Sequence, residues 1–163
     1  MTYYSEDMQG YAVGGGKRAR TGFFHFTLRK RQRNRKGLRG KVWSLMFRLA
    51  QVGSGCDIMT RNIGRRLRVP HISGIIISFY ASIGDDCTIH HQVTIGEESI
   101  AHKGLAPRIG NNVYIGAGAK IIGPIDIGDN VRIGANAVVT KDVPPNCTVV
   151  GANKIIQRTG EDL

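Results

Sequence analysis

A six-residue repeat is the feature that most limits how this chain can fold. Between residues 109 and 139 every sixth position is a β-branched apolar anchor: Ile109, Ile115, Ile121, Ile127, Ile133 and Val139. A second set of apolar or small residues follows the first five anchors at a distance of four: Val113, Ala119, Ile125, Val131 and Ala137. Neither a helix nor an alternating strand has this period. A period of six predicts a parallel β-helix, in which three hexapeptides close one triangular coil and stacked anchors form an apolar column.

The same period begins earlier in the chain and is interrupted twice. One earlier run has four anchors: Ile77, Ile83, Ile89 and Ile95. A run of three precedes it: Ile63, Val69 and Ile75. The register slips by two residues just after His71, and the gap from Ile95 to Ile109 is 14 residues rather than 12. Because insertions in a solenoid map to loops that often carry function, we expect chemistry at both interruptions.

Length, apolar runs and cysteines set broad limits. A chain of 163 residues is expected to form one main domain. It has no apolar run of 18 residues, so no transmembrane helix is predicted, and its acidic, polar first residues do not resemble a signal peptide. Three cysteines without metal-type spacing, Cys56, Cys87 and Cys147, favour a reducing, cytoplasmic location. Within it, the basic N-terminal residues allow a position at the inner membrane surface.

The formal net charge of +11 is concentrated near the N-terminus. Eleven Lys and Arg residues lie between positions 17 and 41, so residues 1–37 are predicted to form a basic, partly disordered arm. No nucleic-acid-reading motif accompanies this charge, which argues against a nucleic-acid partner. Phe23, Phe24 and Phe26 lie beside the basic residues, and this combination suits peripheral contact with an anionic membrane.

A helix is predicted between the basic arm and the repeats. Its apolar residues recur at helical spacing: Leu38, Val42, Leu45, Met46 and Leu49. We expect this amphipathic helix, residues 38–56, to cap the first coil and cover its open β edge. The β-helix domain then spans residues 57–151, and residues 152–163 form a tail. Pro144 and Pro145 cannot donate to a ladder, so the chain should leave the regular coil there before a last strand at Val149 and Val150.

The run from Asp57 to about Ile156 resembles the left-handed β-helix acyltransferases, most closely the serine acetyltransferase branch. Four segments carry the resemblance: Ser73-Gly74-Ile75-Ile76-Ile77, Thr88 to Gly96, Ile115 to Gly123 and Val138 to Pro145. The resemblance implies an all-β fold, a left-handed parallel β-helix with a short N-terminal helix cap. It also implies a homotrimer that uses acetyl-CoA as acyl donor in sites between neighbouring prisms.

His71 lies where this family has its catalytic histidine, and Asp57 matches, with a one-residue deletion, the aspartate that pairs with it. A hydroxyl is a poor nucleophile at neutral pH, and a neutral imidazole can accept its proton during attack. A carboxylate on the other ring nitrogen would fix the tautomer and stabilise the imidazolium. We therefore expect His71 to be the general base and Asp57 its partner.

The coenzyme side is also assigned by resemblance. Gly96, Ala117 and Ala135 match residues that line the pantetheine groove, where small side chains let the backbone approach a thin ligand. Three further residues match positions at the nucleotide end: Thr140, Lys141 and Lys154. Lysines suit phosphate as point charges. The two alanines are equally explained as residues of tight corners.

The acceptor side departs from the serine acetyltransferase pattern. That family has an Arg-His pair before the proline of the insertion loop, where this chain has Leu105 and Ala106 before Pro107. It has an aspartate before the catalytic histidine, where this chain has Pro70. Relatives that O-acetylate sugars of capsule or exopolysaccharide lack such groups. The sequence therefore favours a sugar or polysaccharide precursor as acceptor, with L-serine, in cysteine biosynthesis, as the alternative.

Two other functions remain open at this point. His90, His91 and His102 suggest a zinc site, but adjacent residues of a strand point to opposite faces, so no metal is predicted. A trimeric scaffold whose basic arms bind polyanions would keep the repeats without needing His71. Binding of coenzyme A separates the scaffold from the acyltransferase.

Overall fold

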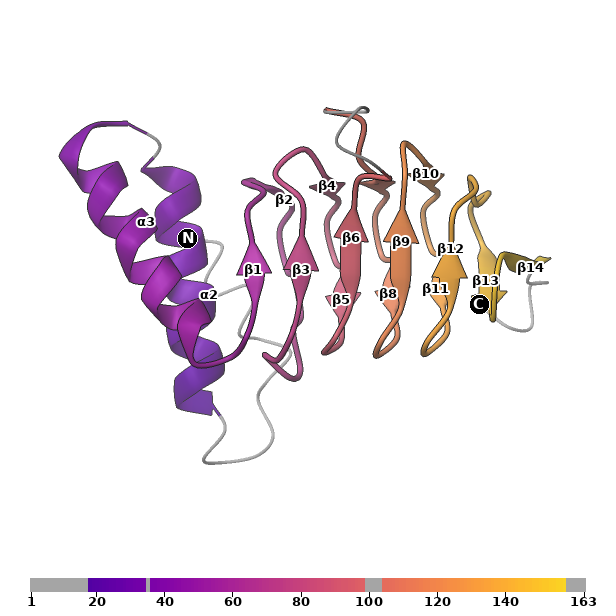
Figure 1. Cartoon of the computed structure of the whole chain (residues 1–163), viewed down its shortest axis with the longest axis horizontal. Helices are drawn as coiled ribbons and strands as arrows, with labels where there is room; N and C mark the ends of the chain where they lie inside the picture. The colour runs from indigo at the N-terminus through magenta and orange to yellow at the C-terminus, as the bar shows by residue number, and fades with distance from the viewer. Residues whose placement is uncertain (1–17, 35, 99–103, 158–163) are drawn as a thin grey trace.

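The computed structural model describes residues 18–34, 36–98 and 104–157. Two helices, α2 (Arg18–Arg33) and α3 (Gly37–Val52), lie side by side at one end of a stack of β coils (Figure 1). The coils follow one another along the long axis, and β13 and β14 lie at the opposite end. In the part of the chain that the structure describes, no helix is long and apolar enough to cross a membrane.

Short strands, all parallel except β14, form the three faces of the prism, which we name sheets I, II and III. Sheet I contains, in order, β1 (Asp57–Ile58), β3 (Ile76–Ile77), β6 (Thr94–Gly96), β9 (Lys120–Ile122) and β12 (Val138–Val139). Sheet II contains β2 (Asn62–Ile63), β4 (Ser82–Ile83), β7 (Arg108–Ile109) and β10 (Asp126–Ile127). Sheet III contains β5 (Thr88–Ile89), β8 (Tyr114–Ile115), β11 (Arg132–Ile133), β13 (Cys147–Val150) and β14 (Lys154–Gln157).

The strand register confirms the repeat read from the sequence. In sheet I, Ile77 pairs with Ile95, Ile95 with Ile121, and Ile121 with Val139. Each of these four anchors is at most 1% exposed. Burying an isoleucine contributes roughly 1.5–3 kcal/mol, so the stacked anchors supply most of the driving force of the coil. The residue before each anchor faces outward, and sheet I therefore presents a separate outer surface.

The corner between sheets II and III is held by a column of polar side chains. Arg66, Asp86, Asn112, Asn130 and Asn146 all have φ between 52° and 60°. Asn and Asp adopt this left-handed conformation more readily than most residues. Asn112 donates its side-chain amide to Asn130 Oδ1 at 2.9 Å, Asn130 donates to Asn146 Oδ1 at 3.0 Å, and Arg66 forms an ion pair with Asp86. The turns of neighbouring coils are thus linked as well as stacked.

The first register slip lies at the corner between sheets III and I. Val69 and Ile77 are eight residues apart, whereas Ile89 and Ile95, one coil later, are six apart. All four side chains are buried, so the core continues and the two extra residues bulge outward at His71. The second slip lies at the corner between sheets I and II, and its residues 99–103 fall outside the described residues.

The helix pair caps the first coil in a way that the sequence does not predict. Arg31 of α2 donates to the carbonyl oxygens of Ile58 (3.0 Å), Met59 (2.6 Å) and Thr60 (3.4 Å). Gln32 donates to the carbonyl of Ile63 at 2.9 Å. These carbonyls form the open edge of the β-helix, and arginine and glutamine side chains satisfy them. Part of the predicted basic arm is therefore a helix that packs on the coil.

Helix α3 forms where a helix is expected, but its orientation differs from the prediction. The apolar residues predicted to face the first coil are largely exposed: Leu38, Val42, Leu45 and Leu49. The opposite side is buried instead, with Phe47 packed on Phe24 at 5.3 Å between ring centroids. Gln51 accepts a hydrogen bond from the backbone N–H of Ile58 at 2.6 Å. Phe47 and Gln51 anchor α3, so the sequence correctly predicts the helix but not its buried face.

The C-terminal end also continues further than predicted. Val143 forms a bridge with Ile127 before the two prolines, and the Asn146 N–H donates to the carbonyl of Asp129 at 3.0 Å after them. The chain therefore stays in the coil past Pro144 and Pro145. The last expected strand is present within β13. The chain then reverses, and β14 pairs with β13 in antiparallel fashion, which covers the edge of sheet III. Without β14, the last coil would leave the edge strand β13 unpaired on one side.

Candidate functional site

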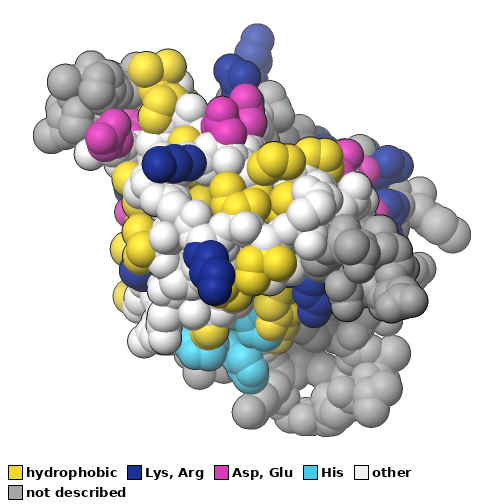
Figure 2. Space-filling model, turned by 90° about the vertical axis from the view of Figure 1, so that its right-hand side faces the viewer, with side chains coloured by type: hydrophobic (Ala, Val, Ile, Leu, Met, Phe, Trp, Pro, Cys, Tyr) yellow, Lys and Arg dark blue, Asp and Glu magenta, His cyan; other side chains and the backbone are white. Residues whose placement is uncertain are grey.

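His71 lies on the bulged corner between sheets III and I, and its side chain is exposed. Its ring meets the ring of His91 edge-on, with centroids 5.7 Å apart and an interplanar angle of 82°. The neighbouring His90 stacks at a tilt on Tyr114, 5.1 Å away. Figure 2 shows histidine side chains gathered along one edge of the prism. The bulge thus places a solvent-accessible imidazole beside two others.

One imidazole of this edge has a lowered pKa. Burial, and then the charges of His71 and His91, lower the pKa of His90 from its ordinary value. His91 is half-buried, and its Nδ1 atom is buried without a hydrogen-bond partner. The lowered pKa favours the neutral form of the His90 imidazole. A neutral imidazole is the form that can accept a proton.

The structure does not bring Asp57 into contact with His71. Asp57 lies in β1 with an exposed side chain, and its backbone N–H donates to the carbonyl of Ile75 at 2.8 Å. Its carboxylate acts electrostatically on Arg31, the arginine that caps the first coil. Within the described residues no hydrogen bond or ion pair joins Asp57 to His71. In this conformation the carboxylate supports the helix cap and not the histidine.

Two of the predicted coenzyme residues stack below the histidine cluster on the same corner. Gly118 donates its N–H to the carbonyl of His91 at 3.0 Å, and Asn136 donates to the carbonyl of Ala117 at 2.8 Å. The corner residues His91, Ala117 and Ala135 therefore lie above one another in successive coils. Ala117 is half-buried and Ala135 is exposed. Methyl groups at these positions leave the corner open below the histidines.

The other predicted coenzyme residues flank the opposite edge of sheet I. Gly96 ends β6, while Thr140 and Lys141 directly follow β12 with exposed side chains. Asn153 accepts a hydrogen bond from the Thr140 N–H and donates to Thr140 Oγ1, both at 2.8 Å. This pairing brings the backbone at Lys154 next to Thr140. The candidate residues thus border the outer face of sheet I on both sides.

Lys120 is a site residue that the sequence reasoning missed. It points outward from β9 in the middle of sheet I, and its Nζ donates to the carbonyl of Gln92 at 2.8 Å and to Thr94 Oγ1 at 3.1 Å. Its place in the repeat, one residue before the anchor Ile121, is the signal that puts it on this outer face. An ammonium group here adds a positive charge between the two borders of the site.

The structure describes some of the residues on the acceptor side of the site. Pro70 is half-buried, Leu105 is 50% exposed and Ala106 is buried. All three side chains are apolar, so none of them contributes a charge. Ser78 donates a hydrogen bond to Glu97 at 2.5 Å, which fixes the first residue of the insertion loop. His102 lies outside the described residues. Among those described, no three His, Cys, Asp or Glu side chains gather as metal ligands.

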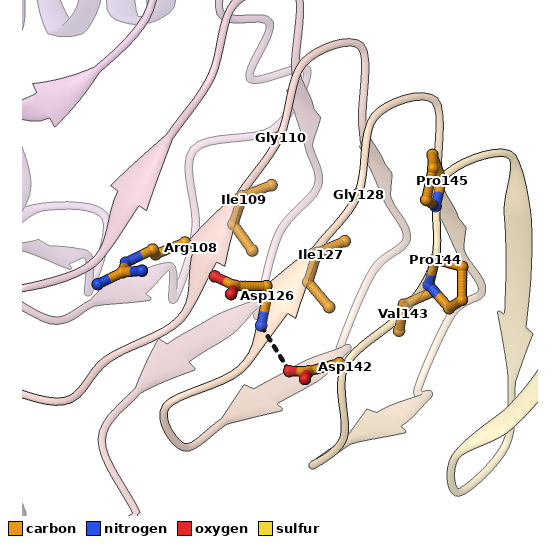
Figure 3. A pocket seen from close by; sticks show the side chains of 10 residues that line it. All are labelled: Arg108, Ile109, Gly110, Asp126, Ile127, Gly128, Asp142, Val143, Pro144 and Pro145. Atoms are coloured by element: carbon orange, nitrogen blue, oxygen red, sulfur yellow. Dashed lines mark hydrogen bonds between the residues drawn. The ribbon is translucent and has the colours of Figure 1, made fainter.

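A separate shallow pocket of about 520 Å³ lies on the outer face of sheet II (Figure 3). Arg108 and Asp126 line it, and Asp142 accepts a hydrogen bond from the Asp126 N–H at 2.8 Å. None of the predicted catalytic or coenzyme residues lines this pocket, so it is distinct from the candidate site.

Comparison with known proteins agrees with this architecture. Residues 106–141 match the family described as "Bacterial transferase hexapeptide (six repeats)". The chain is 51% identical to a serine acetyltransferase of Mycobacterium tuberculosis over 89 residues, which cover 55% of this chain and 39% of that protein. It is 46% identical to a serine acetyltransferase of Helicobacter pylori over 108 residues, covering 66% of this chain and 63% of the relative.

A solved structure shows the same fold. The crystal structure of a serine acetyltransferase in complex with coenzyme A from Brucella abortus superimposes with a TM-score of 0.73 at 26% identity, covering 97% of this chain and 66% of that one. The chain spans between two fifths and two thirds of the length of these relatives. Repeat, strand register and similarity together show that the chain has the left-handed β-helix fold and resembles the hexapeptide-repeat transferases, the serine acetyltransferases among them.

Proposed function

We propose that this chain is an O-acetyltransferase that moves an acetyl group from acetyl-CoA to a hydroxyl, with His71 as general base. One observation carries the proposal: an exposed imidazole on a bulged corner meets the ring of His91, which lies at the head of a column of small corner residues. The relatives named serine acetyltransferase, one of them solved with coenzyme A, support the same class of reaction.

The residues of sheet I fit the donor that this reaction needs. Three strand spacings separate β3 from β12, about 14 Å, so a long thin donor lying along the sheet would reach from the histidines to Thr140. Ala117 and Ala135 leave space for its chain on one side. Lys141 and Lys154 at the far end, with Lys120 between, would attract its phosphates.

In the proposed mechanism, the oxygen of the acceptor hydroxyl attacks the thioester carbonyl carbon. His71 accepts the proton of that hydroxyl during the attack. The resulting imidazolium returns that proton to the departing thiol sulfur when the carbon–sulfur bond breaks. Proton transfer of this kind contributes roughly 10²–10⁴ in rate. Asp57 is retained as the proposed partner of His71 from the resemblance, and it would need to turn away from Arg31 to reach it.

We further propose that the active form is a homotrimer. Among the described residues, Ile76 and Val138 on the outer face of sheet I are exposed, and so is His71 at its edge. A neighbouring prism packed along this corner would close the groove and exclude water. Light scattering on the purified protein tests the assembly, and an active monomer would contradict it.

Two acceptor hydroxyls are candidates, that of L-serine and that of a sugar. The relatives' names favour L-serine over the sugar hydroxyl that the sequence predicts first. L-serine is therefore the acceptor that we propose. A sugar hydroxyl is the second candidate, because Pro70, Leu105 and Ala106 offer no charge to a zwitterion that leaves water on binding.

Release of free thiol from acetyl-CoA, measured with L-serine, nucleotide sugars and oligosaccharides as acceptors, tests the proposal. Saturable turnover with L-serine alone supports the first acceptor, and turnover with a saccharide alone supports the second. A protein that binds no coenzyme A by calorimetry, and turns over none of these acceptors, would instead be a scaffold. His71→Ala should lower turnover by about 10²–10⁴ in the first two cases and leave coenzyme A binding intact.

A further inference from the structure

Helix α3 has an apolar stripe that stays exposed in the described part of the fold. At 100° per residue, its exposed apolar residues fall within an arc of about 80°. These residues, here called the α3 stripe, are Leu38, Val42, Leu45, Leu49 and Val52, with exposed fractions of 78, 48, 59, 59 and 80%. The centre of the arc lies opposite Phe47, the residue that packs into the core. The stripe therefore faces directly away from the protein.

The helix does not need the stripe to stay in place. Phe47 contacts Phe24, Gln51 binds the backbone of the first coil, and Arg61 donates to Ser44 Oγ at 3.3 Å. A contiguous row of exposed leucine and valine on a helix with a complete set of anchors indicates an interaction surface. The question is then what covers it.

Charge identifies the partner. Residues 18–52 contain 11 Lys and Arg and no Asp or Glu, whereas the rest of the chain has 12 of each sign. Residues 18–52, the two helices and the residues between them, therefore account for the whole net charge of +11. Arg39 borders the stripe on one side, Lys41 and Arg48 border it on the other, and all three are exposed. A second copy of this helix pair would bring like charges together, while an anionic bilayer complements them.

We propose that α3 lies flat in the headgroup region of an anionic membrane. The α3 stripe enters the acyl boundary, and Arg39, Lys41 and Arg48 contact lipid phosphates. A 16-residue helix, about 24 Å long, with apolar and basic faces arranged in this way has the form of an interfacial amphipathic helix. The phenylalanines that the sequence assigns to this role are not all available, because Phe24 is buried. The structure moves the proposed membrane contact from the arm to α3.

Vesicle co-sedimentation of the full chain tests the proposal. The probes are vesicles of phosphatidylcholine with 30% phosphatidylglycerol and vesicles of phosphatidylcholine alone, at about 0.1 M salt. Wild-type protein should sediment with the anionic vesicles and at least tenfold less with the neutral ones. The double change Leu45→Ser and Leu49→Ser should lower partition into anionic vesicles at least tenfold. Circular dichroism melting of this variant confirms that it is folded.

A matched control removes exposed apolar residues elsewhere. Ile155→Ser with Ile156→Ser, on β14, should leave vesicle binding unchanged. Equal sedimentation of the Leu45 and Leu49 variant with wild type would show that binding uses charge alone and overturn the insertion of the stripe. Absence of vesicle binding by wild type, combined with a lower assembly mass of the stripe variant in light scattering, would make the stripe a contact between protein copies and overturn the proposal.

Discussion

Replacing Arg31 with Met should destabilise the protein through the open edge of its first coil. The change keeps an unbranched apolar stem near Phe47, whose ring lies 5.0 Å from the guanidinium carbon. It removes hydrogen bonds to the carbonyl oxygens of Ile58 and Met59 at 3.0 and 2.6 Å, and a long one of 3.4 Å to Thr60. The expected loss lies in the two shorter bonds.

The magnitude follows from those two bonds. A hydrogen bond from a charged donor contributes roughly 1.5–3 kcal/mol when it is well buried. Arg31 is only half-buried, and burial lowers its pKa to about 10, which shows that desolvation offsets part of the gain. About 1 kcal/mol for each bond gives about 2 kcal/mol in the free energy of unfolding. For a chain of this size that corresponds to a fall in Tm of about 4–8 °C.

Urea denaturation followed by circular dichroism measures this loss, with Arg39→Met as the control. Arg39 is an exposed arginine of α3, and its replacement should change stability by less than about 0.5 kcal/mol. Uncovered carbonyls should also make the Arg31 variant aggregate at lower concentration. Equal stability of the Arg31 variant and the wild type, or equal losses in both variants, would refute the role of Arg31 as edge cap.

Four further outcomes are expected. His71→Ala should lower kcat by about 10²–10⁴ with little change in coenzyme A affinity, while His90→Ala does less, which steady-state kinetics and calorimetry measure together. Because the pKa of His90 is lowered in the folded protein, its contribution to stability is present above about pH 6.5 and is lost as pH falls; urea denaturation at pH 7.5 and 5.5 should show a smaller loss in His90→Gln than in wild type. Gly118→Ala should cost about 1–3 kcal/mol, since Gly118 has φ of +74° and an added Cβ would lie 2.0 Å from Asn136 Oδ1. Gly96→Ala, whose Cβ would meet nothing closer than 3.8 Å, should keep its stability and lose coenzyme A affinity, and unchanged affinity would remove Gly96 from the proposed groove.

The candidate site was predictable to the extent that it depends on position in the repeat. A residue's offset from its anchor fixes the corner or face on which it lies, so His71, Ala117 and Ala135 could be placed on one edge from sequence spacing. Lys120 could have been found by the same rule. The relation of Asp57 to His71 could not be predicted from the sequence, because it depends on the direction of the Asp57 carboxylate. Arg31 competes with His71 for that carboxylate.

The sequence by itself determined the coil. A period of six with β-branched anchors has one way to bury all its apolar residues, so the register and both interruptions follow from counting. Helix α3 was likewise visible in its spacing. The buried face of α3 was not visible in the sequence. The stripe of leucine and valine is more apolar than the side that Phe47 occupies, and periodicity alone selects the more apolar face.

Only the tertiary structure decided what covers the two ends of the coil. An open β edge presents backbone carbonyls, which need hydrogen-bond donors more than they need apolar contact. Arg31 and Gln32 of a strongly basic helix supply donors at one end, and the antiparallel strand β14 closes sheet III at the other. A hydrophobic pattern cannot indicate such contacts, because they join side chains to main-chain atoms far apart in sequence. Because α3 is anchored through Phe47 and Gln51, its apolar stripe faces outward.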